Sequence, residues 1–301
     1  MIGIVILNYQ TWELSRRCIE SITENPPFSK YQIFLVDNHS SKTPAYDLND
    51  FLARNGIRLI KNEKNSGYNG GNNIGIQAAL NAGCSPILFA NSDIVFRQGA
   101  IQSLADVCVN MDVGITCPQI LDEGGRIQME HMMRPLTLLD KYFVSTRLNL
   151  FFRKRYLSFY GRDRDYEKPF TVFAAHGSCV MMSAGCAKAV LPFDEFPFLY
   201  EEEQMLGIRV RNKGFEEWYV PSAQVEHRHG GSTKQAKAFS FAHSVRSEVY
   251  FCRRYLSVDK WKIMPLYWYR VVLYLFRCLK YEEFRKNIKD FFRISKEGFV
   301  I

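Results

Sequence analysis

The sequence lacks the paired cysteines that mark a disulfide framework or a zinc site. Its 301 residues include eight cysteines, and no two of them form a Cys-x-x-Cys pair. Several of the cysteines, such as Cys108 and Cys179, lie inside apolar runs. We therefore expect buried free thiols in a reducing compartment and no disulfide bonds.

Long apolar runs are missing as well. No stretch reaches the roughly 18 uncharged apolar residues of a membrane span. The N-terminal "MIGIVILNYQ" has no basic leader and is too short an apolar run for a signal peptide, so we expect it to be a first strand of a cytoplasmic protein. The composition, 47% hydrophobic and 23% charged, is ordinary for a globular chain with one large core, or a core plus an appendage.

Excess basic charge is absent from most of the chain and is concentrated in its last fifth. Residues 245–301 contain thirteen Lys or Arg and six Asp or Glu, a net charge of +7, whereas the whole chain carries +8. Aromatic residues are frequent in the same segment. From charge alone, this segment is either a solvated helical face or a surface for anionic lipid or another polyanion.

The first part of the chain alternates strand and helix signals. Apolar runs predict strands over 2–9, 31–38, 56–62 and 86–93, and helical spacing predicts helices over 11–25, 44–55, 70–83 and 99–111. Such alternation predicts an α/β fold, a Rossmann-like mostly parallel sheet flanked by helices. Residues 122–170 show no clear period, and strand character returns at 170–183. We expect a helix at 201–214, an extended segment at 216–231, and only helices from about residue 239.

Polar residues stand at the end of each predicted strand, and in parallel sheets the ligand site lies at these ends. Four polar strand ends favour a polar crevice, although Asn and Asp also suit ordinary turns. The residues concerned are Asn8, Tyr9, Gln10, Asp37, Asn38, Asn62, Asn91, Ser92 and Asp93.

The glycine-rich "SGYNGGNNIG" does not fit a dinucleotide fingerprint. Its glycines do not form G-x-G-x-x-G, and they follow the third strand, whereas the fingerprint needs the first. The stretch still offers backbone N–H groups at a helix N-terminus, which suit a phosphate. Asn91 and Asp93 at a strand end are hard oxygen ligands of the kind that hold Mg²⁺ or Mn²⁺ beside nucleotide phosphates.

A set of motifs in a fixed order then resembles one family. They are "VILNYQ", "FLVDNHS", "NSGYNGGNNIGI", "LFANSDIVF", "HGSCVMM", "FDEFPFLYEEEQMLGIRVRNKGF", "YVPSAQVEH" and "GGST", between residue 3 and about 235. The chain resembles an inverting family 2 glycosyltransferase with the GT-A nucleotide-diphospho-sugar transferase fold. Within that family it looks like the rhamnosyltransferase-like branch that builds bacterial surface polysaccharides.

The resemblance implies roles by position. Asp37 would contact the nucleotide base, Asn8 and Tyr9 would line its pocket, and Asn72 would face the nucleotide or donor sugar. Asn91 and Asp93 occupy the family's Asp-x-Asp, so Asp93 would be the main ligand of a Mn²⁺ or Mg²⁺ cofactor. We group Ser92 and Arg209 with the donor-binding residues and His227 with the metal ligands.

The catalytic base is implied by "EEEQMLGIR". Glu202 and Glu203, followed by Leu206 and Arg209, match the family's Glu-Asp-x-x-Leu-x-x-Arg, whose second acid is the base. The role falls on Glu203, with Glu202 as the alternative. A helix N-terminus favours ionisation of such an acid, which is also why acids are common there without any catalytic role. His227 and His229 could instead form a loop pair or zinc ligands, and His131 and His176 are left unassigned.

These implications predict a glycosyltransferase that moves a sugar from a UDP-sugar or dTDP-rhamnose to a saccharide or lipid-linked saccharide, with inversion, in O-antigen or capsule synthesis. One alternative is a non-catalytic nucleotide-sugar-binding scaffold, because Asn91 weakens the metal site. Another is a sugar-1-phosphate nucleotidyltransferase. That class needs a glycine-rich basic loop after the first strand, where this chain has "NYQTWELS". Nucleic acid is not an expected partner, and a homodimer is possible.

The C-terminal helices predict a second unit. We expect a glycosyltransferase domain at 1–238 and a helical basic-aromatic extension at 239–301. Within it, residues 261–280 predict an interfacial helix that docks the enzyme on the cytoplasmic membrane face. The residues expected to carry that contact are Trp261, Tyr267, Trp268, Tyr269, Arg270, Tyr274, Arg277 and Lys280.

Overall fold

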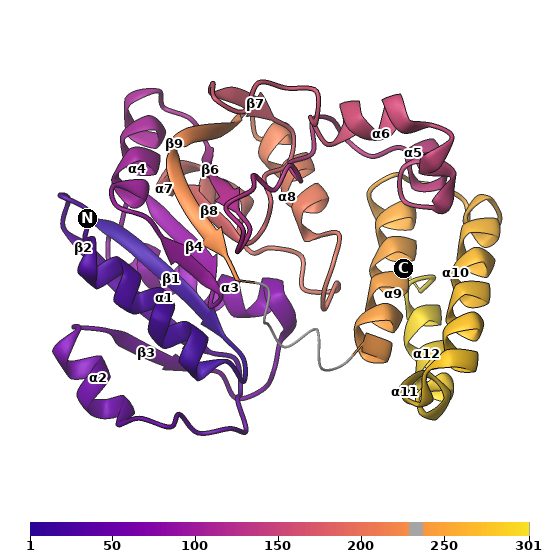
Figure 1. The fold of residues 1–301 in the computed structure, drawn as a ribbon, viewed down its shortest axis with the longest axis horizontal. Helices are drawn as coiled ribbons and strands as arrows, with labels where there is room; N and C mark the ends of the chain where they lie inside the picture. The colour runs from indigo at the N-terminus through magenta and orange to yellow at the C-terminus, as the bar shows by residue number, and fades with distance from the viewer. Residues whose placement is uncertain (229–236, 301) are drawn as a thin grey trace.

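The computed structural model describes residues 1–228 and 237–300 (Figure 1). Within them the strands form one nine-stranded sheet in the order β3-β2-β1-β4-β8-β6-β9-β5, with β7 paired to β9. The four predicted strands form its fully parallel part. They are β1 (Ile2–Asn8), β2 (Tyr31–Asp37), β3 (Arg58–Lys61) and β4 (Ile87–Asn91).

The predicted helices connect these strands. They are α1 (Trp12–Glu24), α2 (Leu48–Arg54), α3 (Gly67–Asn81) and α4 (Ala100–Asn110). Helices cover both faces of the sheet, which is why β1 is apolar along its length and buried on both sides (Figure 1). Thr11 precedes α1, but its side chain bonds to Asn8 and not to the helix backbone.

The other part of the sheet is mixed. Strands β6 (Ile115–Leu121) and β9 (Glu217–His227) run parallel to each other. Strand β8 (Cys179–Met182) is antiparallel to both β4 and β6, and β5 (Ile94–Phe96) and β7 (Phe170–Val172) are antiparallel to β9. Six strands therefore share one direction, which confirms the mostly parallel sheet. Helices α7 (Ala184–Val190) and α8 (Glu202–Asn212) complete this part.

The glycine-rich segment packs closely on the sheet. A Cβ atom at Gly75 would lie 2.2 Å from Val5 Cγ1, and one at Gly71 would lie 2.4 Å from Leu7 Cδ1. Neither position has room for a side chain, because α3 lies directly on β1. These glycines therefore bring α3 close to the strand end that carries Asn8.

The aperiodic segment 122–170 is partly helical and packs against the C-terminus. It contains α5 (Leu138–Phe143), η1 (Arg147–Leu150) and α6 (Arg153–Phe159). A separate apolar core joins residues 136–160 of this segment to the C-terminal helices. Those helices are α9 (Lys237–Arg254), α10 (Lys260–Lys280), α11 (Glu282–Lys286) and α12 (Ile288–Glu297). The domain boundary at residue 238 stays a prediction, but in space the helical unit also includes residues from the middle of the chain.

Three residues of the predicted membrane face prove to be interior. Tyr267 and Tyr274 are buried in the helical core, where Tyr274 stacks on Phe291. Arg270 forms an ion pair with Glu248 at 2.8 Å. We correct that part of the expectation, because helical periodicity turns these three side chains inward. Trp261 and Trp268, by contrast, are exposed.

The cysteines are buried and free, as predicted, at all eight positions. Within residues 1–228 and 237–300, no helix is both long and apolar enough to cross a bilayer.

Candidate active site

The carboxyl ends of β1 and β2 meet through one hydrogen-bonded asparagine. Asn8 is fully buried, and its Nδ2 donates to Asp37 Oδ1 at 3.1 Å and to Ser40 Oγ at 3.2 Å. Its Oδ1 accepts from Ser15 Oγ at 2.9 Å. The buried amide fixes the orientation of the Asp37 carboxylate at the edge of the sheet. We therefore interpret the predicted role of Asn8 in the nucleotide pocket as support for the Asp37 side chain.

A second polar network extends this edge toward β3. Asn62, which follows β3, donates from Nδ2 to Asn38 Oδ1 at 2.9 Å and to Ser66 Oγ at 2.8 Å. Asn38 Nδ2 in turn donates to Asn65 Oδ1 at 3.0 Å. The polar strand ends thus lie together at one edge, and they order the chain that leads into α3.

Asp93 and His227 come together beside the end of β4. The residue after Asp93, Ile94, pairs with His227 across β5 and β9. This register places His227 Nε2 3.4 Å from Asp93 Oδ1, with both residues less than a tenth exposed. Asp93 Oδ1 is buried and has no hydrogen bond to any described residue. Ser92 Oγ lies 2.8 Å from Thr11 Oγ1, which fixes the turn that presents Asp93.

This pair fits a divalent cation. An unbonded buried carboxylate oxygen beside an imidazole nitrogen is an oxygen–nitrogen donor set of the kind that binds Mn²⁺. In the described part of the chain, no group of three or more His, Cys, Asp or Glu could hold a metal by itself. Asp93 and His227 would therefore supply only part of a coordination shell, as expected where substrate phosphates complete it. Asn91, at the end of β4, is half-buried beside them.

Helix α8 presents two acids at its N-terminus. Glu201 precedes the helix in a left-handed conformation, with φ of 69°. Glu203 Oε1 then accepts a hydrogen bond from the Gly177 backbone N–H at 3.3 Å. Because Ser178 accepts from the Asn91 N–H at 2.9 Å, this loop lies next to the end of β4. Glu203 is thereby held at the crevice, near the start of β8 and close to the candidate metal ligands Asp93 and His227.

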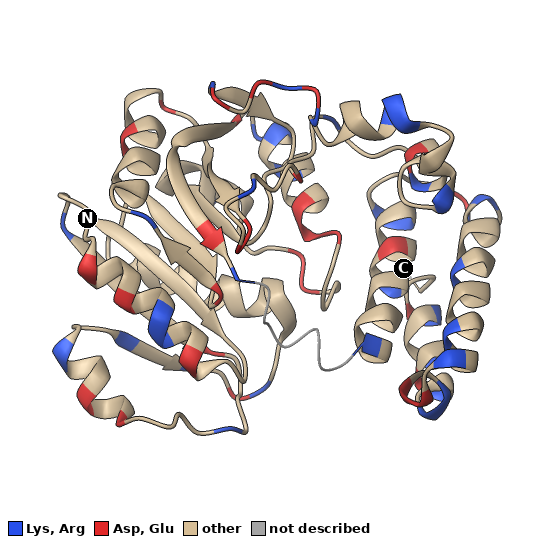
Figure 2. Cartoon of the chain, in the orientation of Figure 1, with Lys and Arg blue, Asp and Glu red and all other residues tan. Residues whose placement is uncertain are grey.

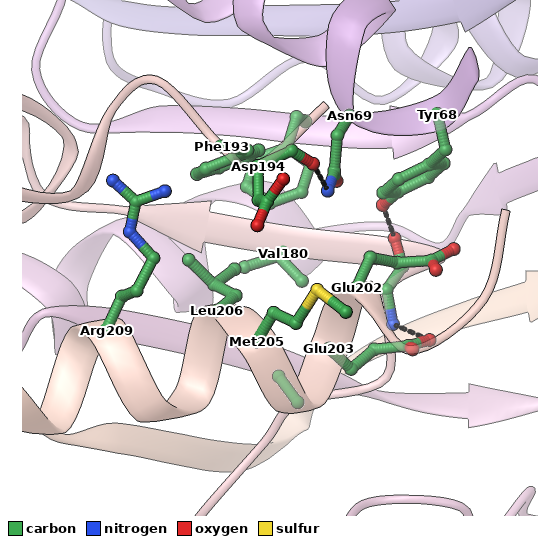
Figure 3. Close-up of a pocket in the computed structure, with 13 residues that line it drawn as sticks. Tyr68, Asn69, Val180, Phe193, Asp194, Glu202, Glu203, Met205, Leu206 and Arg209 are labelled. Carbon is green, nitrogen blue, oxygen red and sulfur yellow. Dashed lines mark hydrogen bonds between the residues drawn. The ribbon is translucent and has the colours of Figure 1, made fainter. Parts of the chain in front are cut away.

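Glu202 has different surroundings. Both acids line a cavity of about 20 Å³ with Tyr68 and Phe193, but the Glu202 Oε2 is buried without a hydrogen bond among the described residues (Figure 3). Burial, together with the nearby Glu203, raises the pKa of Glu202 well above its ordinary value. A raised pKa makes Glu202 the weaker candidate for an ionised base. The assignment of the base to Glu203 stays a prediction.

Tyr68 also reaches the same loop. Its hydroxyl donates to the Gly177 carbonyl, so the Gly177 peptide is bonded on one side by Tyr68 and on the other by Glu203 (Figure 3). A Cβ at Gly177 would lie 3.1 Å from Glu203 Oε1 and 3.2 Å from the Tyr68 hydroxyl. The absence of a side chain at Gly177 is thus what lets both groups approach.

His176 is a site residue that the sequence did not assign. Its ring lies 5.8 Å from that of His227, and its Nε2 lies 3.2 Å from Glu130 Oε2. Burial opposes its protonation, but Glu130, Glu203 and Asp93 together raise the pKa of His176. His176 therefore stands between the candidate metal ligands and the candidate base. The sequence signal was its place directly before Gly177 in "HGSCVMM".

His131 holds the backbone of His176 through a hydrogen bond. It is fully buried, and its Nδ1 accepts from the His176 backbone N–H at 3.1 Å. Burial and the charge of His176 lower the pKa of His131 to about 3, so it stays neutral and can keep accepting this bond. No metal role is needed to explain His131.

The remaining predicted residues lie further from this centre. Asn72 is buried on α3, where its Nδ2 donates to Tyr68 O at 3.1 Å and its Oδ1 has no hydrogen bond among the described residues. Arg209 lies at the other end of α8 and donates to Pro192 O at 2.6 Å (Figure 3). Tyr9 follows β1 and is half-buried. Their donor-binding roles stay predictions. His229 and the "GGST" segment fall outside the described residues.

The family can now be stated from a direct comparison. The family model for glycosyl transferase family 2 matches residues 3–191, more than half of the chain. The protein belongs to that family. The match covers β1 through α7, including Asp37, Asp93 and Gly177.

Named relatives agree with this assignment. The chain is 26% identical over 284 residues to an N-acetylglucosaminyl-diphospho-decaprenol L-rhamnosyltransferase of Mycobacterium tuberculosis, covering 89% of this chain and 88% of the relative. It is 27% identical over 213 residues to the low-salt glycan biosynthesis hexosyltransferase Agl10 of Haloferax volcanii. That match covers 70% of this chain but only 62% of the relative. The similarity is to the rhamnosyltransferase-like type of the family.

Solved structures confirm the GT-A fold. GalNAc-T7, solved with UDP, GalNAc and Mn²⁺, superposes with a TM-score of 0.59 at 16% identity, over 84% of this chain and 49% of that one. TarS of S. aureus superposes with a TM-score of 0.53 at 12% identity, over 84% of this chain and 40% of that one. At these identities the likeness concerns the fold alone.

Proposed function

We propose that the protein transfers a sugar, with inversion, from a nucleotide-diphosphate donor to a hydroxyl group of a saccharide acceptor. The observation that carries this proposal is the position of Glu203. It is a half-buried acid at a helix N-terminus, held by the Gly177 N–H, beside the strand end that carries Asp93. The family assignment supplies the reaction class, and the site supplies the residues.

Glu203 is the proposed base. In an inverting transfer, the acceptor hydroxyl attacks the anomeric carbon from the face opposite the nucleotide and loses its proton to a carboxylate. The hydrogen bond from the Gly177 N–H aims one oxygen of Glu203, and the carboxylate keeps further lone pairs for the acceptor hydroxyl.

The donor would lie along the polar edge of the sheet. Asp37, oriented by Asn8, is placed to accept from the nucleotide base, and the diphosphate would reach Asp93 and His227. A divalent cation bound there would neutralise charge on the departing diphosphate. Mn²⁺ or Mg²⁺ is proposed because Asp93 leaves a buried oxygen unbonded, and because GalNAc-T7, with the same fold, was solved with Mn²⁺.

The named relatives indicate the donor and acceptor classes. One is named as a rhamnosyltransferase that acts on a diphospho-decaprenol-linked sugar. By that analogy we propose dTDP-rhamnose or a UDP-sugar as donor and a lipid-linked saccharide as acceptor, in cell-surface polysaccharide synthesis at the inner face of the membrane.

A donor panel tests the proposal. Purified protein is incubated with UDP- and dTDP-sugars, Mn²⁺ and a short lipid-linked or water-soluble acceptor, and nucleoside diphosphate release is measured. We expect release that depends on both acceptor and metal, with an inverted anomeric product by NMR. In a parallel incubation with added pyrophosphate, formation of nucleoside triphosphate and sugar-1-phosphate would instead point to a nucleotidyltransferase. Tight nucleotide binding without any release by the panel would indicate a scaffold.

A further inference from the structure

The C-terminal helical unit exposes a continuous apolar stripe on α10. The exposed side chains recur at helical spacing on the side opposite the helical core. Leu279 is 80% exposed and Trp261 is 73% exposed, which is unusual for residues of this size. The stripe consists of Trp261, Pro265, Trp268, Val272, Leu275 and Leu279.

A second exposed apolar element lies beside it. The end of η1 and the loop that follows it carry Leu150 and Phe151, which are 76% and 83% exposed. The Arg147 backbone N–H donates to the Tyr269 hydroxyl of α10 at 3.3 Å. Leu150 of the loop and Phe276 of α10 line one open groove of about 540 Å³. The two elements, far apart in sequence, therefore form one surface, defined as the stripe residues of α10 together with residues 147–154.

The charges of this surface have one sign. Helix α10 contains five Lys or Arg and no Asp or Glu, as its blue segments show (Figure 2). The loop side adds Arg147, Arg153 and Lys154, and no acid occurs between Arg147 and Phe159. Lys262 and Lys280 are exposed on the flank of the apolar stripe, whereas Arg277 lies over the rings of Phe241 and Phe284. Asp259, directly before α10, is an exposed acid near Trp261 and pairs with Lys262 at 3.4 Å. Apolar side chains flanked by this excess of cations are complementary to a bilayer surface that carries anionic headgroups.

A second copy of the chain is a less suitable occupant. A two-fold pairing through α10 would bring Lys and Arg of one helix next to those of the other. No acid on α10 could neutralise them, so like charges would be desolvated together. Lipid phosphates remove this conflict, and Trp side chains suit the headgroup region.

The surface is firmly connected to the candidate active site. Arg270 of α10 donates to Glu248 of α9 at 2.8 Å and to Ser145 O at 3.0 Å. Glu248 Oε1 lies 4.0 Å from Lys141 Nζ, which is also bonded to Glu201, two residues before the proposed base Glu203. This buried chain of charges joins the exposed helix to the start of α8. A bound membrane would therefore hold the crevice in a fixed orientation.

We propose that the stripe of α10 and residues 147–154 together dock the protein on an anionic lipid bilayer. The inference deepens the proposed function, because a lipid-linked acceptor would be presented at that bilayer. It differs from the sequence expectation in its residues. Tyr267, Arg270 and Tyr274 face inward, whereas the loop with Leu150 and Phe151 is a new contributor.

Vesicle co-sedimentation of the full chain tests the proposal without donor or acceptor. Vesicles of phosphatidylcholine with phosphatidylglycerol should sediment the protein, and vesicles of phosphatidylcholine alone should do so much less. Each basic residue near an anionic surface contributes about fivefold to binding, so Lys262→Glu/Lys280→Glu should weaken it by about 25-fold or more. Leu150→Ser/Phe151→Ser should weaken binding by at least roughly tenfold.

Matched controls are available elsewhere on the surface. Lys188→Glu/Lys213→Glu makes the same change in net charge, and Val109→Ser with Met111→Ser removes exposed apolar side chains from the end of α4. Both controls should sediment like the wild type. Circular dichroism checks the fold of every variant.

Two results would overturn the inference. One is wild-type protein that stays in the supernatant with anionic vesicles. If sedimentation velocity then shows a dimer that Trp268→Ser dissociates, the surface is a dimer interface instead. The other is equal loss of binding in the controls and the test variants. Diphosphate release with a water-soluble acceptor should be unchanged in all of them, so a failure here is separable from a failure of the proposed function.

Discussion

The sheet edge and the C-terminal helical unit depart from ordinary burial in opposite ways. At the edge, polar oxygens of Asn72, Asp93 and Glu202 are buried without hydrogen bonds among the described residues. In the helical unit, large apolar side chains such as Phe151 and Leu279 face solvent. Each arrangement costs free energy in the isolated protein. A polar ligand would relieve the first cost, and a lipid surface would relieve the second.

The difference shows where each kind of variant should act. Substitutions at the edge should change transfer while leaving the fold intact. Substitutions in the buried contacts between the two regions should change stability and, through α8, the position of the base.

The largest effect is expected at Glu203. Glu203→Gln keeps the size of the side chain and its contact with Gly177 but cannot take a proton, so kcat should fall by about 10²–10⁴-fold. Donor affinity, measured by calorimetry, should barely change. Glu202→Gln is the matched control and should be milder, because the Gly177 N–H holds Glu203 and not Glu202. The reverse order of effects would move the base to Glu202.

The buried ion pair between the regions comes next. Lys141→Met leaves Glu201 without its cation, and breaking such a pair typically costs about 3–5 kcal/mol of unfolding free energy. Burial alone would lower the pKa of Lys141, but Glu201 and Glu248 raise it, so the lysine is charged. Urea unfolding measures the loss. The double variant Lys141→Met/Glu201→Gln should recover part of it, and equal stability of all three proteins would contradict a connected unit.

Asp93 should affect metal binding before anything else. Asp93→Asn keeps the shape but removes the charge, so Mn²⁺ affinity, read from the EPR signal of free Mn²⁺ in the presence of nucleoside diphosphate, should drop. The metal-dependent rate should fall by roughly 10²-fold, since a bound cation supplies several kcal/mol. The melting temperature should stay within a few degrees of the wild type. Unchanged Mn²⁺ binding would exclude Asp93 as a ligand.

The last effect concerns stability alone, with no expected change in transfer, and is a pH dependence at Glu217, a buried acid that the proposed chemistry does not use. Burial raises its pKa to about 8, although the Ala175 N–H and the more distant Arg211 oppose the shift. The neighbouring ionisable groups Cys117 and Cys186 are buried thiols with raised pKa values. Below its ordinary pKa of 4.5, Glu217 is protonated in both states. As the pH rises toward 8, only the unfolded state releases the proton, so stability falls.

Glu217→Gln removes that dependence. Relative to the wild type, the variant should gain up to about 1.4 kcal/mol of unfolding free energy per pH unit between roughly pH 5 and pH 8. Urea titrations at several pH values measure the difference. Because His131 titrates equally in both proteins, its contribution cancels. Parallel pH profiles of the two proteins would show that Glu217 is already ionised in the fold.

The sequence alone determined the parallel part of the sheet and its polar edge. Continuous apolar runs with helices between them allow little else, and every predicted strand from β1 to β4 appears within a few residues of its expected bounds. Motif order also indicated the family. These features are local or periodic, so they can be read without knowing what packs on what.

Tertiary structure decided what depends on distant partners. The aperiodic segment 122–170 becomes short helices because the C-terminal helices supply an apolar core for it. The preference for Glu203 over Glu202 rests on which acid meets the Gly177 N–H and which has a buried oxygen without a hydrogen bond among the described residues. Likewise, the sequence shows that Arg270 is basic and Tyr274 aromatic, but it does not show which way either side chain faces. Only the packing of α10 on α9 turns both inward and leaves Trp268 and Leu279 facing out, because exposure is a property of the neighbours and not of the residue.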